Sequence, residues 1–330
     1  MGFLEVENIT KKFGRQTALD DINVSIERGE LVCILGPSGC GKTTLIRIIA
    51  GLETADGGRI YMDGRDCTEL PASKRNLGIV FQSYALFPNM TVHGNIMFGL
   101  RQKKELPRDE ANAKALEVLR LVDLLEHKDK YPRQLSGGQQ QRTALARAIA
   151  LSPDYLLLDE PLSALDAKVR VKLRGEIRKI QRALSVTTVM VTHDQEEALT
   201  MADRIIVMNN AVVEQIGTPR EIYNHPATPF VANFIGMMNF YEREGEVCAI
   251  RPENIALADR RDVYDASAKI QSLEFKGPLT RIHGILPGAE EIFVDISSEA
   301  VDNLSLRENS MIFLRMPEDN VMKYSEGSLI

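Results

Sequence analysis

"LVCILGPSGCGKTTLIRIIAGL", residues 31–52, decides the fold of the 330-residue chain. The run 31–35 is apolar and typical of a buried strand, and residues 36–43 match the phosphate-loop pattern G-x-x-x-x-G-K-[ST] in full. After the loop, four apolar residues repeat at the spacing of one helix face: Leu45, Ile48, Ile49 and Leu52. Because the motif requires a strand before it and a helix after it, this stretch predicts a nucleotide-binding α/β domain.

The phosphate loop carries the groups that bind a nucleoside triphosphate. Backbone N–H groups of the loop and of the helix start surround the phosphates, Lys42 adds a point charge between the β and γ groups, and Thr43 offers its hydroxyl to Mg²⁺. The predicted nucleotide-binding residues here are Gly36, Pro37, Ser38, Gly39, Cys40, Gly41, Lys42, Thr43 and Thr44. ATP and Mg²⁺ are therefore the expected cofactors. A glycine-rich turn without a ligand is the alternative, and the flanking strand and helix argue against it.

Two acids end a second apolar run, "YLLLDEP", residues 155–161. An acid at the carboxyl end of a central strand lies in the crevice where open α/β sheets bind ligands. We expect Asp159 to bind the magnesium ion and Glu160 to orient or activate the attacking water, a role that needs a carboxylate within hydrogen-bond reach. Alone, the two acids are equally consistent with a polar loop, but the phosphate loop favours the catalytic interpretation.

Two further polar residues follow predicted strands at the same edge of the sheet. His193 follows "TTVMVT", and an imidazole there can donate to a γ-phosphate oxygen. Gln82 follows "LGIVF" and is predicted to reach the metal and the water. By itself, His193 would more often be a structural residue, and Gln82 would be equally consistent with a plain polar residue, so both assignments depend on the neighbouring motifs.

The stretch "LSGGQQQR", residues 135–142, predicts a second anion site. Ser136 is the expected cap of a helix whose first turn is Gly137-Gly138-Gln139, so unpaired N–H groups and the positive dipole end face outward. One triphosphate needs only one cradle, and Lys42 already lies in it. We therefore expect this helix start to serve a nucleotide bound to another copy, although an ordinary glycine-containing helix entry is the alternative.

The rest of the chain predicts two domains. Residues 3–34 predict antiparallel strands, and hairpins are predicted at Asp63-Gly64 and at Asn209-Asn210. Between the two hairpins, strands alternate with helices, which implies a parallel sheet. Long helices are expected over 107–130 and 167–184. Short strand-like runs then fill a small all-β, OB-like domain over 240–330. The predicted division is a nucleotide-binding domain over 1–236, with a helical subdomain at about 86–152, and a β-rich domain over 237–330.

Composition limits the partners and the compartment. The formal net charge is −6, and no dense run of Lys or Arg occurs, so neither nucleic acid nor an anionic lipid surface is the expected partner. The four scattered cysteines, Cys33, Cys40, Cys67 and Cys248, fit a reducing cytosol. The chain starts without a signal-like segment, and no window approaches 18 apolar residues, so we expect that it does not enter a membrane by itself.

Taken together, the phosphate loop, Gln82, "LSGGQQQR", "YLLLDE", "SALD" at 163–166 and His193 resemble the nucleotide-binding subunit of ATP-binding cassette (ABC) transporters, in that family's order. The resemblance implies a head-to-tail homodimer in which two ATP molecules are sandwiched, each between the Lys42 loop of one copy and the Ser136 loop of the other. It also implies that Phe13 stacks on adenine, where the family more often has Tyr, and that Asp166 belongs to the nucleotide site.

The β-rich region resembles the C-terminal domain of bacterial importer ATPases, with "GMMNFYE" and "AIRPENIAL" in the corresponding places. This resemblance implies permease subunits as partners, an extracytoplasmic solute-binding protein indirectly, and a place at the cytoplasmic face of the membrane. Residues 83–96, with exposed apolar and aromatic side chains expected in "SYALFPN", are predicted to contact the permease. The implied solutes are, in order, 2-aminoethylphosphonate, a polyamine such as spermidine or putrescine, and ferric iron.

Two hypotheses from other classes remain at this point. One is a soluble ABC ATPase that acts on nucleic acid, although such proteins usually carry tandem cassettes or a long coiled-coil insertion. The other is a regulatory binding role for the C-terminal domain. Copurification with a membrane protein, salt-sensitive nucleic-acid binding, or solute binding to the C-terminal region separates these possibilities.

Overall fold

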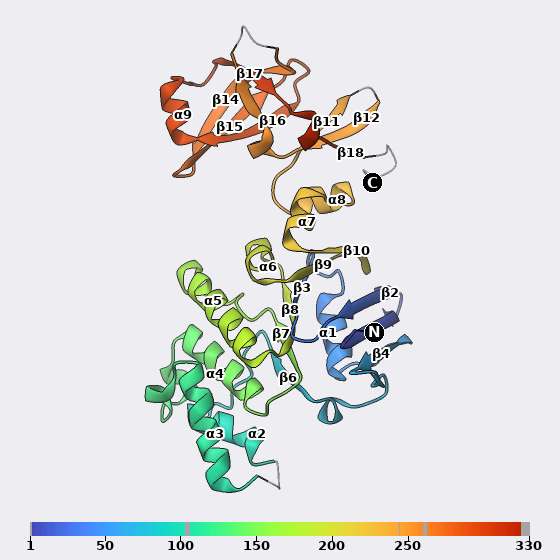
Figure 1. Cartoon of the computed structure of the whole chain (residues 1–330), viewed down its shortest axis with the longest axis vertical. Helices are drawn as coiled ribbons and strands as arrows, with labels where there is room; N and C mark the ends of the chain where they lie inside the picture. The colour runs from blue at the N-terminus through green and yellow to red at the C-terminus, as the bar shows by residue number, and fades with distance from the viewer. Residues whose placement is uncertain (1, 103–105, 244, 260–262, 325–330) are drawn as a thin grey trace. The chain divides into compact units, whose positions relative to one another are not determined.

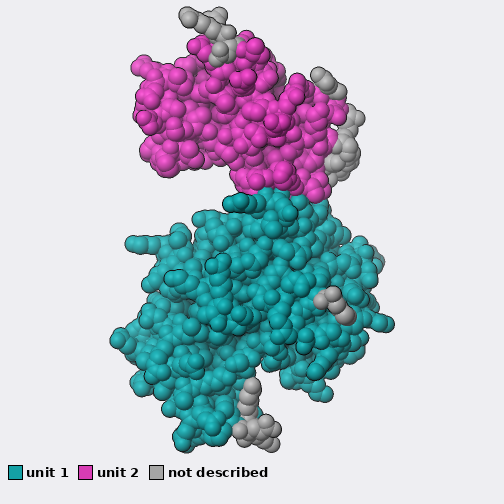
Figure 2. Space-filling view, viewed as in Figure 1, with its two compact units in different colours: residues 1–222 teal, residues 223–330 magenta. Residues whose placement is uncertain are grey.

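The chain forms two compact units, residues 1–222 and 223–330, each described here by itself (Figure 2). The computed structural model describes residues 2–102, 106–243, 245–259 and 263–324. The domain boundary predicted at residue 236 stays a prediction. In the described part of the chain, no helix combines the length and the apolar character needed to span a bilayer.

A six-stranded sheet in the order β10-β9-β3-β8-β7-β6 is the centre of the first unit (Figure 1). All neighbours are parallel except β10, which pairs antiparallel with β9. The hairpin is present, but its turn is Asn210-Ala211, one residue later than predicted, because Asn209 still pairs with Val212 and the next two residues take left-handed φ values. The strands β3, β7 and β8 are buried along their whole length, as expected of apolar runs in a parallel sheet. The bounds are Leu31–Leu35 (β3), Leu77–Val80 (β6), Tyr155–Asp159 (β7), Thr187–Thr192 (β8), Arg204–Asn209 (β9) and Val212–Gly217 (β10).

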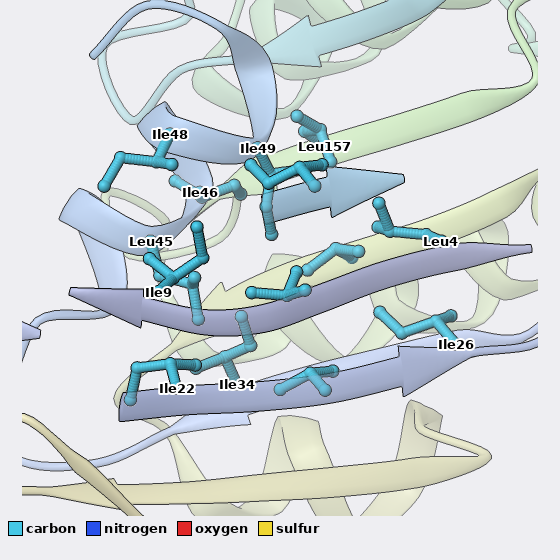
Figure 3. Close-up of a cluster of buried hydrophobic side chains, with 14 of the residues drawn as sticks. Leu4, Ile9, Ile22, Ile26, Ile34, Leu45, Ile46, Ile48, Ile49 and Leu157 are labelled. Carbon is cyan, nitrogen blue, oxygen red and sulfur yellow. The ribbon is translucent and has the colours of Figure 1, made fainter. Parts of the chain in front are cut away.

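An antiparallel sheet in the order β2-β1-β4-β5 packs beside helix α1 and the central sheet. Figure 3 shows Leu4, Ile9 and Ile22 of this sheet in one cluster with Ile34 and the helix side chains. The bounds are Leu4–Phe13 (β1), Gln16–Ile26 (β2), Gly57–Met62 (β4), Arg65–Asp66 (β5) and Lys42–Ala50 (α1). The predicted hairpin at Asp63-Gly64 is present, with both residues in the left-handed region that its tight turn requires.

Among the residues that the structure describes, three helices besides α1 precede β7 and form the helical part of this unit, and three others of this unit follow β7, the last of which continues into the second unit. The bounds are Val92–Leu100 (α2), Arg108–Leu121 (α3), Gly137–Ile149 (α4), Ala167–Leu184 (α5), Gln195–Met201 (α6) and Pro219–Asn224 (α7). The predicted helix over 167–184 is confirmed. The predicted helix over 107–130 is too long, because Asp123 adopts a left-handed φ of 53° that ends α3, and only a short 3₁₀ turn follows.

The apolar face predicted for α1 is correct for three of its four residues. Leu45, Ile48 and Ile49 are buried, but Leu52 is 50% exposed. The helix ends at Ala50 because Gly51 takes a left-handed conformation, so Leu52 lies outside the helical repeat. Ile46 is buried instead (Figure 3).

The second unit is β-rich, as predicted. It contains sheets in the orders β11-β12-β18 and β13-β17-β14-β15-β16, all antiparallel, and its largest apolar cluster includes Ile270, Ile282 and Leu314. The bounds are Asn239–Arg243 (β11), Glu246–Ile250 (β12), Ala256–Ala258 (β13), Ala266–Phe275 (β14), Leu279–Ile285 (β15), Glu291–Ser297 (β16), Met311–Arg315 (β17), Met322–Tyr324 (β18), Pro229–Phe234 (α8) and Ser298–Asn303 (α9).

Candidate active site

The phosphate loop joins β3 to α1 and is shaped by two glycines that admit no side chain. A Cβ on Gly36 would lie 2.2 Å from the carbonyl oxygen of Met208. Gly41 has a φ of 107°, and a Cβ there would lie 2.3 Å from the carbonyl oxygen of Ala18. The motif therefore reflects backbone crowding as well as phosphate binding.

The ammonium group of Lys42 folds back over the loop. Its Nζ donates to the carbonyl oxygens of Gly36 and Pro37, both at 2.8 Å, and the side chain is only 6% exposed. The sulfur of Cys40 lies 3.8 Å from the same nitrogen. The charge is thus held at the centre of the loop by groups that a phosphate could replace.

Thr43 and Asp159 meet at the carboxyl edge of the central sheet. The Thr43 hydroxyl donates to Oδ1 of Asp159 at 3.4 Å. Burial raises the pKa of Asp159, the neighbouring Glu160 carboxylate adds to the rise, and Arg47 opposes it. Elements distant in sequence therefore place two oxygen donors next to the phosphate loop.

These two oxygen donors fit a magnesium ion. Mg²⁺ typically takes one or two protein oxygens and completes its shell with water and substrate phosphates. Within the described ranges, no group of three or more His, Cys, Asp or Glu side chains is placed to hold a metal by itself. A site made of Thr43, Asp159 and bound phosphate agrees with both facts.

Glu160 brings the predicted catalytic residues together. Gln82 Nε2 donates to Glu160 Oε2 at 3.2 Å, and His193 Nδ1 lies 3.3 Å from the same oxygen. The three residues follow or end the adjacent strands β6, β7 and β8, whose carboxyl ends meet at one edge. Among the described residues, Oε1 of Glu160 has no hydrogen-bond partner and so can accept from a water molecule.

The backbone at Glu160 is strained and firmly held. Its φ is 47°, a conformation that costs a residue with a side chain about 1–3 kcal/mol. Its N–H donates to the carbonyl of Val191 at 3.0 Å, and its own carbonyl accepts from the Ser163 hydroxyl at 3.0 Å. Strain that is maintained in this way fixes the direction of a side chain, which a catalytic carboxylate requires.

The helix start at Ser136 forms a complete capping box. Ser136 Oγ accepts from the N–H of Gln139 at 3.3 Å, and Gln139 Oε1 accepts from the N–H of Ser136 at 2.9 Å. The two glycines also have a packing role, since a Cβ on Gly137 would lie 2.9 Å from the Leu165 side chain. In the described part of the chain, no hydrogen bond joins this helix start to the phosphate loop of the same copy.

Two other predicted nucleotide-site residues lie apart from the loop. Asp166 is the N-cap of α5 and accepts from the N–H of Val169 at 3.0 Å. Phe13, at the end of β1, is 50% exposed, and the Lys11 ammonium lies 5.1 Å from its ring centre. An exposed ring with a cation on one side retains a free face for stacking.

The exposed aromatic and larger apolar side chains predicted in "SYALFPN" are not found, because Tyr84 is buried and Leu86 and Phe87 are half-buried. Tyr84 is only 7% exposed, so this aromatic ring does not contribute to the apolar surface expected in "SYALFPN". Its backbone is left-handed, with a φ of 61°. Ala85, Pro88 and Asn89 are exposed.

The sequence reasoning missed the residues that shape the turn around His193. Thr192 Oγ1 donates to the buried Glu197 at 2.7 Å and accepts from the N–H of Asp194 at 3.0 Å. Asp194 caps α6 and forms an ion pair with Arg170 at 2.7 Å. The signal that could have found them is the Asp194-x-x-Glu197 spacing, which is typical of a helix N-terminus.

Comparisons with known proteins identify the family. The model of the family described as "ABC transporter" matches residues 19–163, and the "TOBE domain" model matches residues 248–322. The Fe(3+) ions import ATP-binding protein FbpC 2 of Rhizobium meliloti is 48% identical over 93% of this chain and 87% of that protein. The chain belongs to the ABC transporter ATP-binding proteins.

Other relatives of this ABC protein agree. The sulfate/thiosulfate import ATP-binding protein CysA of Thermosynechococcus vestitus is 47% identical over 96% of both chains. The spermidine/putrescine import ATP-binding protein PotA of Haemophilus influenzae is 51% identical over 78% of this chain and 68% of its own. The sequence-based resemblance to importer ATPases with a C-terminal TOBE domain is confirmed. The cassette is an ATPase whose activity is coupled to transport.

Solved structures confirm the fold of the cassette. A structure titled as the dimer of a bacterial ABC transporter cassette, MJ0796, superposes with a TM-score of 0.59 at 35% identity, over 66% of this chain and 99% of that one. A second structure with the same score, identity and coverage is titled as a post-hydrolysis dimer bound to ADP and Pi. The predicted α/β cassette fold is therefore correct.

Proposed function

We propose that this cassette hydrolyses Mg²⁺-ATP in a head-to-tail homodimer and powers solute import through separate permease subunits at the cytoplasmic face of the membrane. The convergence of Gln82 and His193 on Glu160, at the edge that carries the Lys42 loop, is the observation on which the proposal rests. An extracytoplasmic solute-binding protein is the expected indirect partner.

The proposed roles follow from the contacts. Lys42 leaves the Gly36 and Pro37 carbonyls for the β- and γ-phosphates. Thr43 and Asp159 would hold Mg²⁺, which would supply positive charge next to the phosphates. Glu160 accepts the proton of the attacking water on Oε1, the oxygen that does not bond to Gln82 or His193.

Gln82 and His193 fix the carboxylate of Glu160 by bonding to its other oxygen. With Nδ1 donating to Glu160, His193 can also donate from Nε2 to a γ-phosphate oxygen only as the protonated imidazolium. From the same position, Gln82 would also contact the metal and the attacking water.

The partner copy completes each nucleotide site in this proposal. Ser136 is exposed, and its helix start has no hydrogen bond to the phosphate loop of its own copy among the described residues. Gly137 and Gly138 then present N–H groups to the partner's γ-phosphate. The N–H of Gln139, which was also predicted to be unpaired, donates to Ser136 Oγ in the capping box, so Gln139 would contribute through its side chain. Asp166 lies beside them in this proposal, and Phe13 stacks on adenine within each copy. The dimeric cassette structures named above support this arrangement.

A dilution series tests the dimer. ATP turnover per copy is expected to fall in proportion to protein concentration once the dimer dissociates, since a single copy lacks half of the site. A rate per copy that stays constant down to the strictly monomeric range contradicts the proposal.

The proposed solute is a small charged molecule. We retain 2-aminoethylphosphonate as the first choice. Polyamines and ferric iron are the alternatives, and the names of two relatives support them. The name of a third relative adds sulfate or thiosulfate as a further class of solute. Uptake of each labelled compound by cells with and without this subunit separates them. A nucleic-acid role has no support from these import relatives or from the net charge of −6.

A further inference from the structure

The turn that follows Gln82 has a strained backbone. Tyr84 and Ala85 are consecutive residues with left-handed φ values of 61° and 47°. Residues that carry a Cβ adopt this region only where the surroundings hold them there. The N–H of Tyr84 donates to the carbonyl of Phe81 at 2.8 Å, so the strained turn closes directly around Gln82.

The side chain of Arg147 holds this turn. Its Nη1 donates to the carbonyl of Ala85 at 2.7 Å, and its Nη2 donates to the carbonyl of Tyr84 at 3.1 Å. The planar guanidinium can bond to two acceptors at once, and it also lies 5.6 Å from the ring centre of Phe87. Both strained residues therefore bond through their carbonyls to a single side chain.

The later part of the same segment is held by a different residue. Asn95, which is fully buried in α2, bonds to the N–H and the carbonyl of Phe87 and to the carbonyls of Met90 and Thr91. Among the described residues, Arg147 is thus the only side chain that donates to the carbonyls of Tyr84 and Ala85. Its removal leaves the rest of the segment anchored.

Helix α4 supports Gln82 from both sides. Arg147 lies in the last turn of α4. Ala148, the next residue of this helix, contacts β6 closely, since a Cβ on Gly78 would lie 2.5 Å from its carbonyl oxygen. The strand before Gln82 and the turn after it therefore both contact the C-terminal end of α4. The other end of the same helix is the Ser136 start (Figure 1).

We propose that Arg147 is a positioning residue that holds the Tyr84–Ala85 turn in its strained form and thereby aims Gln82 at Glu160. Because one continuous helix joins Arg147 to Ser136, engagement of the Ser136 start by the partner's nucleotide reaches Gln82 of the same copy through this contact. The second statement rests on the dimer proposed above.

The test is a double-mutant cycle on the full-length protein. Arg147→Ala, Gln82→Ala and the double variant are compared for ATP turnover, with KM and kcat separated, and amide hydrogen exchange of residues 82–90 is measured in parallel. Arg147→Lys keeps the charge but loses the planar fork, so it provides a second variant if Arg147→Ala folds poorly. Arg120→Ala, which removes an exposed arginine from the same helical region, is the matched control.

We expect Arg147→Ala to lower kcat on the order of tenfold while KM changes by less than about twofold, because charge-assisted hydrogen bonds hold the turn but do not touch ATP. In the Gln82→Ala background the same change is expected to have little further effect. Exchange of residues 82–86 is expected to accelerate in both Arg147 variants and not in Arg120→Ala, whereas residues 87–90, which Asn95 holds, should exchange as in the unmodified protein.

Two outcomes overturn the positioning role of Arg147 and leave the proposed function intact. One is that Arg147→Ala lowers kcat by the same factor whether or not Gln82 is present. The other is that amide hydrogen exchange in the Tyr84–Ala85 turn is unchanged in the Arg147 variants. A different outcome, full turnover by Gln82→Ala alone, removes the proposed role of Gln82 and this inference with it. The failure of the proposed function is thus distinguishable from the failure of the positioning role.

Discussion

Glu160→Gln is the substitution that most cleanly separates ATP binding from ATP hydrolysis. Gln has the shape of Glu, so Gln82 Nε2 can still donate to an oxygen at position 160. The left-handed backbone there is held by Val191 and Ser163, which the substitution does not touch. We therefore expect the fold and the site geometry to be retained.

The chemistry of Glu160→Gln is expected to fail because an amide cannot take a proton from water. Positioned general bases contribute about 10²–10⁴-fold, or about 2.7–5.4 kcal/mol of the activation barrier, so kcat should fall by that factor. ATP affinity should not fall, since loss of the Glu160 charge lowers the pKa of Asp159 and favours the carboxylate that binds Mg²⁺.

Steady-state phosphate release, ATP titration and gel filtration check these expectations for Glu160→Gln. The variant should bind ATP and elute as a stable dimer because it cannot complete turnover. Glu117→Gln, at an exposed position on α3, is the matched control and should behave as the unmodified protein. Turnover by Glu160→Gln at more than a tenth of the normal rate refutes the assigned role.

Substitutions at three further positions test the nucleotide site. Lys42→Ala removes charge-assisted hydrogen bonds of about 1.5–3 kcal/mol, so calorimetric ATP affinity should fall about tenfold or more, and unchanged affinity contradicts the cradle. Phe13→Ala should weaken ATP binding by about 1–3 kcal/mol through lost stacking while Phe13→Tyr retains it, and equal affinities in both variants exclude a stacking role. Asp159→Asn should abolish Mg²⁺-dependent hydrolysis yet stabilise the fold at neutral pH, because burial raises the pKa of Asp159 and its ionisation opposes folding. This gain in melting temperature should shrink as the pH falls and vanish below the ordinary value of 3.8, where the carboxyl is protonated in both states, and a pH-independent gain argues against this cause.

Local sequence patterns were sufficient to predict most of the elements that position the site. The apolar runs of β3, β7 and β8 and the motif between them predict a parallel sheet with polar groups at one edge. Helix ends were less predictable, since the end of α3 depends on the left-handed conformation of Asp123, to which no strong sequence signal points. Leu52 was misplaced because the helix ends at Ala50 and Gly51 takes a left-handed conformation, a helix-end signal that the apolar spacing alone overrode in the prediction.

Contacts between distant segments could not be predicted from sequence. No pattern in "SYALFPN" indicates that Tyr84 is buried or that its carbonyl accepts a hydrogen bond from Arg147, sixty-three positions further along the chain. Likewise, the sequence predicted an outward-facing helix start at Ser136 but not the close approach of Gly137 to Leu165. Such contacts depend on the packing of whole elements, which the residue types alone do not specify.

The most direct test of the composite site mixes two inactive variants. Lys42→Ala removes the cradle of one copy, and Ser136→Glu places a carboxylate where the partner's γ-phosphate is expected, so each variant alone should be inactive. In a mixed dimer, the intact Lys42 loop of the second copy faces the intact Ser136 start of the first. An equal mixture should therefore recover about a quarter of the normal ATP turnover, since about half of the dimers are mixed and each has one complete site. A mixture that remains as inactive as either parent contradicts the claim that two copies build each site.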